Sequence, residues 1–188
     1  FFRGYSLTNS GSQEFKSYSD MKKVRKLSGL KIDPPEEFSN GYAFQNADVS
    51  MVEATDDNGE RAFTYANVSL YYRNGTGGRL YISAHAQREE LQSDPRPAAE
   101  ERVIGSATVT CYRDNYLFVP GDYQPSAEEE AWGNIPGNYI SYGGDQVERN
   151  TVTFLRWNQN GITYIIMDPS GAEDTNALFA IAEELLNR

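Results

Sequence analysis

The sequence contains one cysteine and one histidine among its 188 residues, and no long uninterrupted apolar run. A single cysteine, Cys111, excludes an internal disulfide framework and any zinc or iron–sulfur site built on clustered cysteines. A single histidine, His85, excludes His-rich metal sites and leaves one residue for a histidine-dependent mechanism. A helix that crosses a bilayer needs about 20 consecutive apolar residues, and the sequence has no such stretch.

Lysine is absent after residue 31, although the chain carries a net charge of −10. Five lysines and two arginines against two acids give residues 1–31 a net charge of +5. Ten arginines against 25 acids give residues 32–188 a net charge of −15. This excess of acids argues against nucleic acid as a partner.

The basic beginning of the chain has two interpretations. It can dock on the acidic body of the same domain, which we expect to be the commoner arrangement, or it can face an anionic membrane surface. In the second case the patch consists of the cations in and around the first expected helix: Lys16, Lys22, Lys23, Arg25 and Lys26.

Hydrophobic residues make up 39% of the chain and aromatic residues 13%, which is too much for a disordered protein. The length suits one ordinary domain. We expect an extended arm or linker over residues 1–16 and a single domain over 17–188. The charged, proline-containing segment near 88–101 is the best candidate for a mobile connection.

Three helices are expected. The first runs from about residue 20 to Ser28, with Met21, Val24 and Leu27 on its buried stripe and Gly29 as its stop. A capping box of Ser126 and Glu129 begins a short helix that ends near Trp132. A helix with a wide apolar face spans about 175–187 and must pack on a sheet.

Strand patterns fill the rest of the chain. Apolar residues recur with period two over 42–55, 63–72, 79–86, 103–112, 116–119, 139–142, 147–158 and 162–168. Turns are expected at Asp56–Gly59, at Asn74–Gly78, at Asp114-Asn115 and at Asn160-Gly161. Hairpins dominate and no βαβ crossover is evident, so the class is α+β, with a mainly antiparallel sheet of about seven to eight strands.

The residues that carry chemistry form no recognised catalytic pattern. His85 shares a strand face with Tyr81 and Ser83 and is interpreted as a solvent-side residue. Cys111 lies inside a strand and is interpreted as a small packing residue. Paired acids such as Glu89-Glu90 are interpreted as solvated surface residues and not as two carboxylates that face each other across a cleft. We therefore assign no catalytic residue, no metal site and no cofactor.

The aromatic residues leave one possibility open. Exposed rings on a sheet can stack on sugars or peptides, but tyrosine also fills half-buried pleated positions well, and this second interpretation is preferred. The residues concerned are Tyr65, Tyr71, Tyr72, Tyr81, Trp132, Tyr139, Tyr142 and Trp157.

The order of short motifs resembles a known family. The motifs are LSGL at 27–30, PExFxNGYxF at 35–44, NYLFVPxDY at 115–123, YISYG at 139–143, Val147-Glu148, Trp157, NGIxY at 160–164 and AEE at 182–184. Together they look like domain of unknown function 4367, found in secreted or membrane-anchored proteins of Gram-positive bacteria and in proteins that resemble anti-sigma factors. The resemblance implies an extracytoplasmic location and an anchor upstream of Phe1, and it brings no catalytic residue or cofactor.

The expected function is a non-enzymatic extracytoplasmic module that binds or senses a component of a Gram-positive cell envelope, either a ligand or a protein partner. The alternative is a hydrolase of envelope polymers that uses a carboxylate pair or His85. An enzyme requires a deep cleft with convergent polar groups, whereas a binding module requires only an aromatic or apolar patch.

Overall fold

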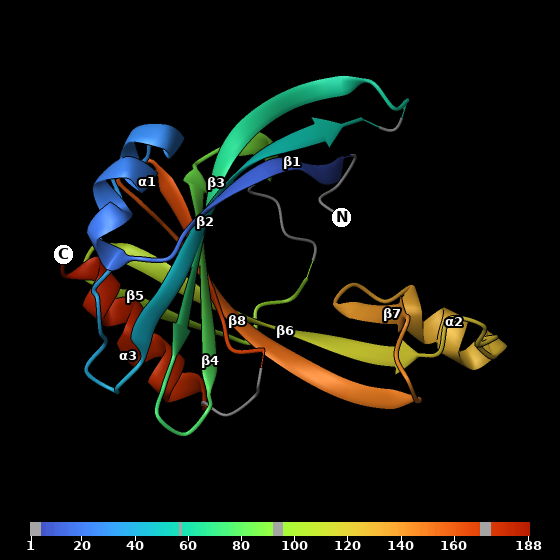
Figure 1. Cartoon of the computed structure of the whole chain (residues 1–188). Coiled ribbons are helices and arrows are strands. Elements are labelled where there is room, and N and C mark those ends of the chain that lie inside the picture. The colour runs from blue at the N-terminus through green and yellow to red at the C-terminus, as the bar shows by residue number, and fades with distance from the viewer. Residues whose placement is uncertain (1–4, 57, 92–95, 170–173) are drawn as a thin grey trace.

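The computed structural model describes residues 5–56, 58–91, 96–169 and 174–188, which form an α+β protein around one sheet (Figure 1). The strands are β1 (Ser6–Phe15), β2 (Ala43–Thr55), β3 (Arg61–Arg73), β4 (Arg79–Ala86), β5 (Glu100–Ile104), β6 (Ala107–Val119), β7 (Asn138–Tyr142), β8 (Glu148–Gln159) and β9 (Ile162–Met167). The α-helices are α1 (Met21–Ser28), α2 (Ala127–Gly133) and α3 (Thr175–Leu186), and short 3-10 turns lie at Tyr18–Asp20 and Glu89–Leu91. The expected fold class is confirmed.

Eight of the nine strands form an antiparallel series in the order β1-β2-β3-β4-β9-β8-β6-β5. The ninth, β7, pairs with β6 in parallel. The expectation of no βαβ crossover is therefore wrong at one place. Helix α2, which begins at the capping box, lies in the connection that returns the chain parallel to β6.

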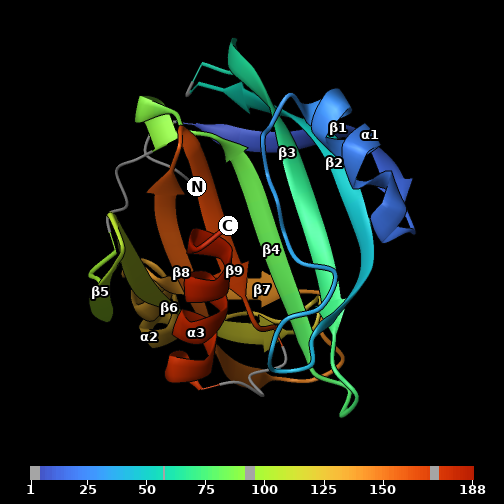
Figure 2. The same cartoon turned by 90° about the vertical axis from the view of Figure 1, so that its left-hand side faces the viewer.

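The two faces of the sheet differ because side chains alternate along each strand. Helices α1 and α3 cover one face, α3 over β8 and β9 and α1 beside β2 and β3 (Figure 2). The main apolar core lies between them and the sheet and contains Val68, Leu70, Ile82, Leu155 and Ile166. We call the opposite side the open face. Figure 1 shows that α2 and β7 lie beyond it, far from α1 and α3.

The strongest local signals are confirmed. Helix α1 ends at Gly29, which adopts a left-handed conformation with φ 72°. Asn160 and Gly161 join β8 to β9 with φ values of 52° and 75°. In α2, the Ser126 hydroxyl accepts a hydrogen bond from the Glu129 N–H, and the Glu129 carboxylate accepts one from the Ser126 N–H.

The start of the chain differs from the expected arm or linker. Residues 6–15 are extended, but they pair with β2 along their length and form the edge strand β1. Their polar sequence has no strand pattern, so local propensity does not indicate this role. These residues form a strand because they pair with the long strand β2 and because Phe15 is buried in the main core.

The expected turn at Asp114-Asn115 is also wrong, because β6 continues through both residues. Asp114 is buried on the open face and accepts two hydrogen bonds from Arg96, at 2.7 and 2.8 Å. Asn115 donates to Asn138 and accepts from Thr151, on the two neighbouring strands. These cross-strand partners hold the two residues in the sheet.

The segment expected to be a mobile connection makes specific contacts at both of its described ends. Leu91 is fully buried against the open face, and Arg88 lies over the Phe63 ring at 4.4 Å. Arg96 pairs with Asp114, and residues from Glu100 onward form β5. Residues 92–95 lie outside the described part of the chain.

Candidate functional site

The open face of β3 and β4 carries a ladder of paired polar and aromatic side chains. The strands are in antiparallel register, and the pairs from the hairpin end inward are Arg73 with Arg79, Tyr71 with Tyr81, Ser69 with Ser83, and Asn67 with His85. The alternating residues Tyr72, Leu70, Leu80 and Ile82 point into the main core. A two-residue period thus places the whole ladder on one surface.

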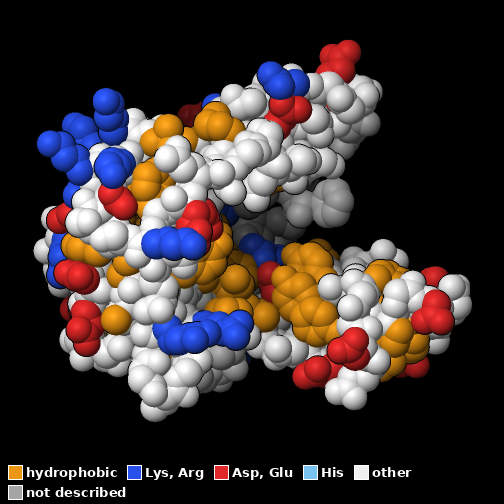
Figure 3. All heavy atoms as spheres, viewed as in Figure 1, with side chains coloured by type: hydrophobic (Ala, Val, Ile, Leu, Met, Phe, Trp, Pro, Cys, Tyr) orange, Lys and Arg blue, Asp and Glu red, His pale blue; other side chains and the backbone are white. Residues whose placement is uncertain are grey.

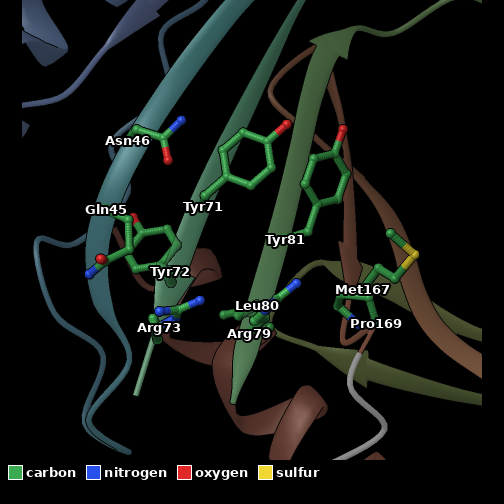
Figure 4. Close-up of a pocket in the computed structure, with 10 residues that line it drawn as sticks. All are labelled: Gln45, Asn46, Tyr71, Tyr72, Arg73, Arg79, Leu80, Tyr81, Met167 and Pro169. Carbon is green, nitrogen blue, oxygen red and sulfur yellow. The ribbon is translucent and has the colours of Figure 1, made fainter. Parts of the chain in front are cut away.

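A pocket of about 500 Å³ lies over the outer part of this ladder. Figure 4 shows the rings of Tyr71 and Tyr81 side by side, with Asn46 on one flank and Met167 on the other. Arg73 and Arg79 lie at the hairpin end of the pocket. The described lining residues are Gln45, Asn46, Tyr71, Tyr72, Arg73, Arg79, Leu80, Tyr81, Met167 and Pro169, and none of them is acidic.

On the scale of the whole molecule, the open side is hollowed. Figure 3 shows this hollow between the part formed by the β2–β3 hairpin and the part formed by β6, β7 and β8. Hydrophobic side chains cover much of its inner surface, and blue cationic groups lie near its centre.

The two tyrosine rings form the floor of the pocket. Their centroids are 5.4 Å apart and their planes meet at 60°. Tyr71 is 37% exposed and Tyr81 is half-buried. Burial, followed by Tyr81 and Asp48, raises the pKa of the Tyr71 phenol, so at neutral pH the floor presents a neutral hydroxyl.

A chain of hydrogen bonds holds the Tyr81 side chain in place. The Ser83 hydroxyl donates to Asn67 Oδ1 at 2.7 Å, and Asn67 Nδ2 donates to Ser69 Oγ at 3.1 Å. Ser69 Oγ in turn shares a 3.0 Å hydrogen bond with the Tyr81 hydroxyl. Both serines are buried, so the Tyr81 side chain is held in one arrangement by groups that lie beneath it.

The two arginines at the pocket have no ion-pair partner in the described part of the chain. Arg73 and Arg79 are Cα partners across the β3–β4 pair and are both exposed. Several other arginines have an acidic partner within 4 Å, namely Arg25, Arg61, Arg88, Arg96 and Arg102. Directly opposed like charges destabilise a strand pair, so the pairing of these two arginines does not stabilise the fold.

Two carboxylates form a pair on the strands at one side of the pocket rather than across it. Asp48 on β2 is the register partner of Glu14 on β1. Burial, followed by the Glu14 charge, raises the pKa of Asp48. Glu14 itself is paired with Lys16 at 3.4 Å. Two acids on adjacent strands with the same orientation do not flank a bond from both sides, as a glycosidase needs.

His85 faces the same side as Tyr81 and Ser83, as predicted, but it is not on the solvent side. It is 5% exposed and lies beneath the Tyr65 ring, 5.1 Å away. Tyr65, which covers His85, packs together with Leu91 and Val52 at this end of the open face. His85 Nδ1 lies 2.9 Å from the Ala86 carbonyl oxygen, and burial lowers the pKa of the imidazole. Arg156 and Arg88 also lower it.

Cys111 is fully buried in the main core, and burial raises the pKa of its thiol. Its interpretation as a small packing residue is confirmed. The thiol is held in its protonated, weakly nucleophilic form.

Five of the eight aromatic residues that the sequence singled out divide between two roles. Tyr72 and Trp157 are in the main core, and Tyr65 is buried beside Leu91, so the packing interpretation is correct for these three. Tyr71 and Tyr81 instead line the pocket.

Sequence reasoning did not identify Arg73, Arg79, Asn46 or Met167 as site residues. The signal for the arginines is the segment RNGTGGR at 73–79, in which a turn of five residues places two cations opposite each other.

The basic residues expected to form an anionic-surface patch lie on and beside α1. Met21 and Val24 turn this helix toward the sheet, and the cations gather at the outer surface (upper left in Figure 3). Lys16, Lys23 and Arg25 pair with Glu14, Asp20 and Asp33 respectively. Lys22 and Lys26 have no ion pair within the described residues, and Leu27, expected to be buried, is 52% exposed beside them. Two of these ion pairs lie within residues 1–31, and the third joins Arg25 to Asp33 in the acidic part of the chain.

Within residues 5–56, 58–91, 96–169 and 174–188, no three His, Cys, Asp or Glu side chains are grouped to hold a metal ion. None of the helices described there has the length and apolar character to cross a membrane. The chain matches no protein-family model, no curated protein and no solved structure.

Proposed function

We propose that this protein is a non-enzymatic binding or sensory module that holds its ligand in the pocket over β3 and β4. The observation that carries the proposal is the combination, on one surface, of two tyrosine rings, one of them held by hydrogen bonds, with two arginines that have no ion-pair partner among the described residues. A pocket of about 500 Å³ falls within the range typical of small-molecule sites.

The proposed binding mechanism uses each part of the site differently. The rings of Tyr71 and Tyr81, together with Met167, remove the apolar surface of the ligand from water. Arg73 and Arg79 supply charge-assisted hydrogen bonds at one end. The hydrogen-bonded serines below Tyr81 reduce the ordering cost of binding, because the Tyr81 ring is already held in place.

We place the module outside the cytoplasm, in a Gram-positive cell envelope, where a segment upstream of Phe1 would anchor it. Two features support this location: the resemblance of the short motifs to those of the extracytoplasmic family, and the outward-facing cations of α1. In that setting Lys22, Lys23 and Lys26 would face the anionic surface of the membrane.

A hydrolase has less support. His85 has no carboxylate bonded to it in the described part of the chain and is buried beneath Tyr65. Asp48 and Glu14 lie side by side rather than across the pocket. Neither arrangement gives a general acid and a base on opposite sides of a substrate.

The test is a thermal-shift screen of the whole chain against muropeptides, teichoic-acid fragments, acidic and neutral oligosaccharides, peptides and divalent ions. A ligand at 100 times its Kd adds about 2.7 kcal/mol of stability, which moves the Tm of a domain this size by roughly 5–10 °C. We expect Tyr71→Ala to abolish the shift. Tyr142→Ala, an exposed tyrosine on β7, should retain it. A flat panel, or a hit that Tyr71→Ala leaves intact, would overturn the proposal.

A further inference from the structure

The charge distribution of the pocket selects the kind of ligand. The chain has ten more acids than bases, yet the described lining of this pocket contains two arginines and no acid. Because Arg73 and Arg79 are opposed across the strand pair, an anion between them would relieve their mutual repulsion. The guanidinium group also matches carboxylate and phosphate oxygens in geometry.

The floor of the pocket offers contacts that an inorganic ion alone would not use. Tyr71 and Tyr81 offer ring surface together with hydroxyl groups, and Met167 extends the apolar part. The Asn46 side chain makes no hydrogen bond within the described residues, and Figure 4 shows it beside Tyr71. A ligand that uses these groups has an apolar ring face and several hydroxyls at its edge.

A saccharide has both properties, because one face of a sugar ring exposes C–H groups and its rim carries hydroxyls. We infer that the pocket binds an anionic saccharide. The sugar ring lies over Tyr71 and Tyr81, a ring hydroxyl bonds to Asn46, and the acidic group lies between Arg73 and Arg79. This inference rests on the proposed function and specifies the ligand of that same site.

The acidic group can be the carboxylate of a uronic acid or the phosphate of a sugar-phosphate polymer, since both present oxygens to paired arginines. Asp48 lies one register row away from Tyr71 on the neighbouring strand, and its charge opposes an anion placed deeper along the ladder. The acidic group is therefore held at the hairpin end, and the neutral part of the sugar extends inward.

The experiment is calorimetric titration of the whole chain with matched probes. Tetragalacturonate supplies carboxylates, and its methyl ester is the same sugar without charge. A glycosylated ribitol-phosphate oligomer supplies phosphates, and tetraglutamate supplies carboxylates without sugar. We expect at least one acidic saccharide to bind, with the ester and tetraglutamate about tenfold weaker or more. The stronger of the two acidic arms identifies the acidic group.

Variants then connect binding to the arginines. Arg73→Gln with Arg79→Gln should raise the Kd for the acidic probe about tenfold or more and leave the Kd for the ester unchanged. Arg73→Lys with Arg79→Lys, which keeps the charge but loses the planar fork, should give an intermediate Kd. Arg113→Gln, an exposed arginine on β6, is the control and should bind as the parent chain does. Unchanged melting temperatures show that the variants are folded.

Three results would overturn the inference: equal affinity for the ester and the acid, tetraglutamate bound as tightly as the acidic saccharides, or a double arginine variant with parental affinity. If a neutral sugar or a peptide binds and Tyr71→Ala abolishes that binding, the inference fails and the proposed function stands. If no saccharide binds, the inference fails, and the broader thermal-shift panel decides the proposed function separately.

Discussion

Two neighbouring tyrosines show how one residue type takes opposite roles in this sheet. Tyr72 is 2% exposed, and its hydroxyl donates to the Pro35 carbonyl oxygen at 2.7 Å, so it belongs to the core. Tyr71, one position earlier, turns to the open face and lines the pocket. Burial raises the pKa of the Tyr72 phenol strongly and that of Tyr71 in the same direction. The alternation of the strand, and not the residue type, decides which ring can meet a ligand.

At the same scale, burial of His85 predicts a pH dependence of stability. The pKa of His85 is lowered in the folded state, so the unfolded chain binds its proton first as the pH falls. The groups that face it, Tyr65, Arg156 and Arg88, include no acid that would retain the charge. Stability contributed by the neutral imidazole is present above about pH 6.5 and decreases as the pH falls below that value.

Urea unfolding between roughly pH 5.5 and 7.5 measures this effect around the ordinary histidine pKa. The parent chain should lose stability as the pH falls through this interval. His85→Gln should be less stable at pH 7.5 but nearly flat across the interval. The pKa of Asp48 is raised in the folded state, so its protonation stabilises the folded chain as the pH falls and does not mimic the effect. Parallel curves for the two proteins would show that His85 is not the group responsible.

At the scale of elements, the sheet contains both local hairpins and pairings between distant segments. The β3–β4 and β8–β9 hairpins are local, and their turn residues indicate them directly. The pairing of β4 with β9 joins segments about 80 residues apart and brings Met167 beside Tyr81. One flank of the pocket therefore depends on a long-range pairing.

The β8–β9 turn offers a test of local backbone control. Gly161 has a φ of 75°, a conformation that costs a residue with a side chain roughly 1–2 kcal/mol. Gly161→Ala should therefore lower the free energy of unfolding by about 1 kcal/mol, measured by urea denaturation. Gly75→Ala is the matched control, since its backbone is not left-handed and the space around it is open. An equal effect at both positions would contradict the explanation.

At the scale of the whole molecule, the basic helix and the pocket lie on different sides of the sheet. The basic helix α1 lies on the covered side of the sheet, and the pocket lies on the open side. A membrane bound through α1 would therefore leave the pocket accessible. The net charge of −15 on residues 32–188 opposes approach to any anionic surface, so attraction has to come from local contacts within a Debye length of about 8 Å.

Liposome co-sedimentation tests this arrangement. The chain should bind vesicles that contain anionic lipid at low salt and should not bind neutral vesicles. Each basic residue near the surface contributes about 1 kcal/mol, so the triple variant Lys22→Gln, Lys23→Gln, Lys26→Gln should weaken binding by roughly two orders of magnitude. A variant with Arg61, Arg113 and Arg149 changed to Gln removes the same charge elsewhere and should bind normally. Equal binding to neutral and anionic vesicles would exclude the membrane role.

The sequence by itself determined the class of fold, most of the elements and the ends of two helices. These features depend on local chemistry: a glycine at 29, a capping box at Ser126 and period-two alternation in β3 and β4. It also placed Tyr81 and His85 on one face, because that follows from counting along a strand.

Only the tertiary structure decided which of those residues form a site. His85 is buried beneath the Tyr65 ring of the neighbouring strand, and the role of β1 depends on pairing with β2. The pocket depends on the register that sets Arg73 opposite Arg79 and on the β4–β9 pairing that adds Met167. These are contacts between distant segments, whose free energy comes from the packing of the whole sheet and leaves no local signal in the chain.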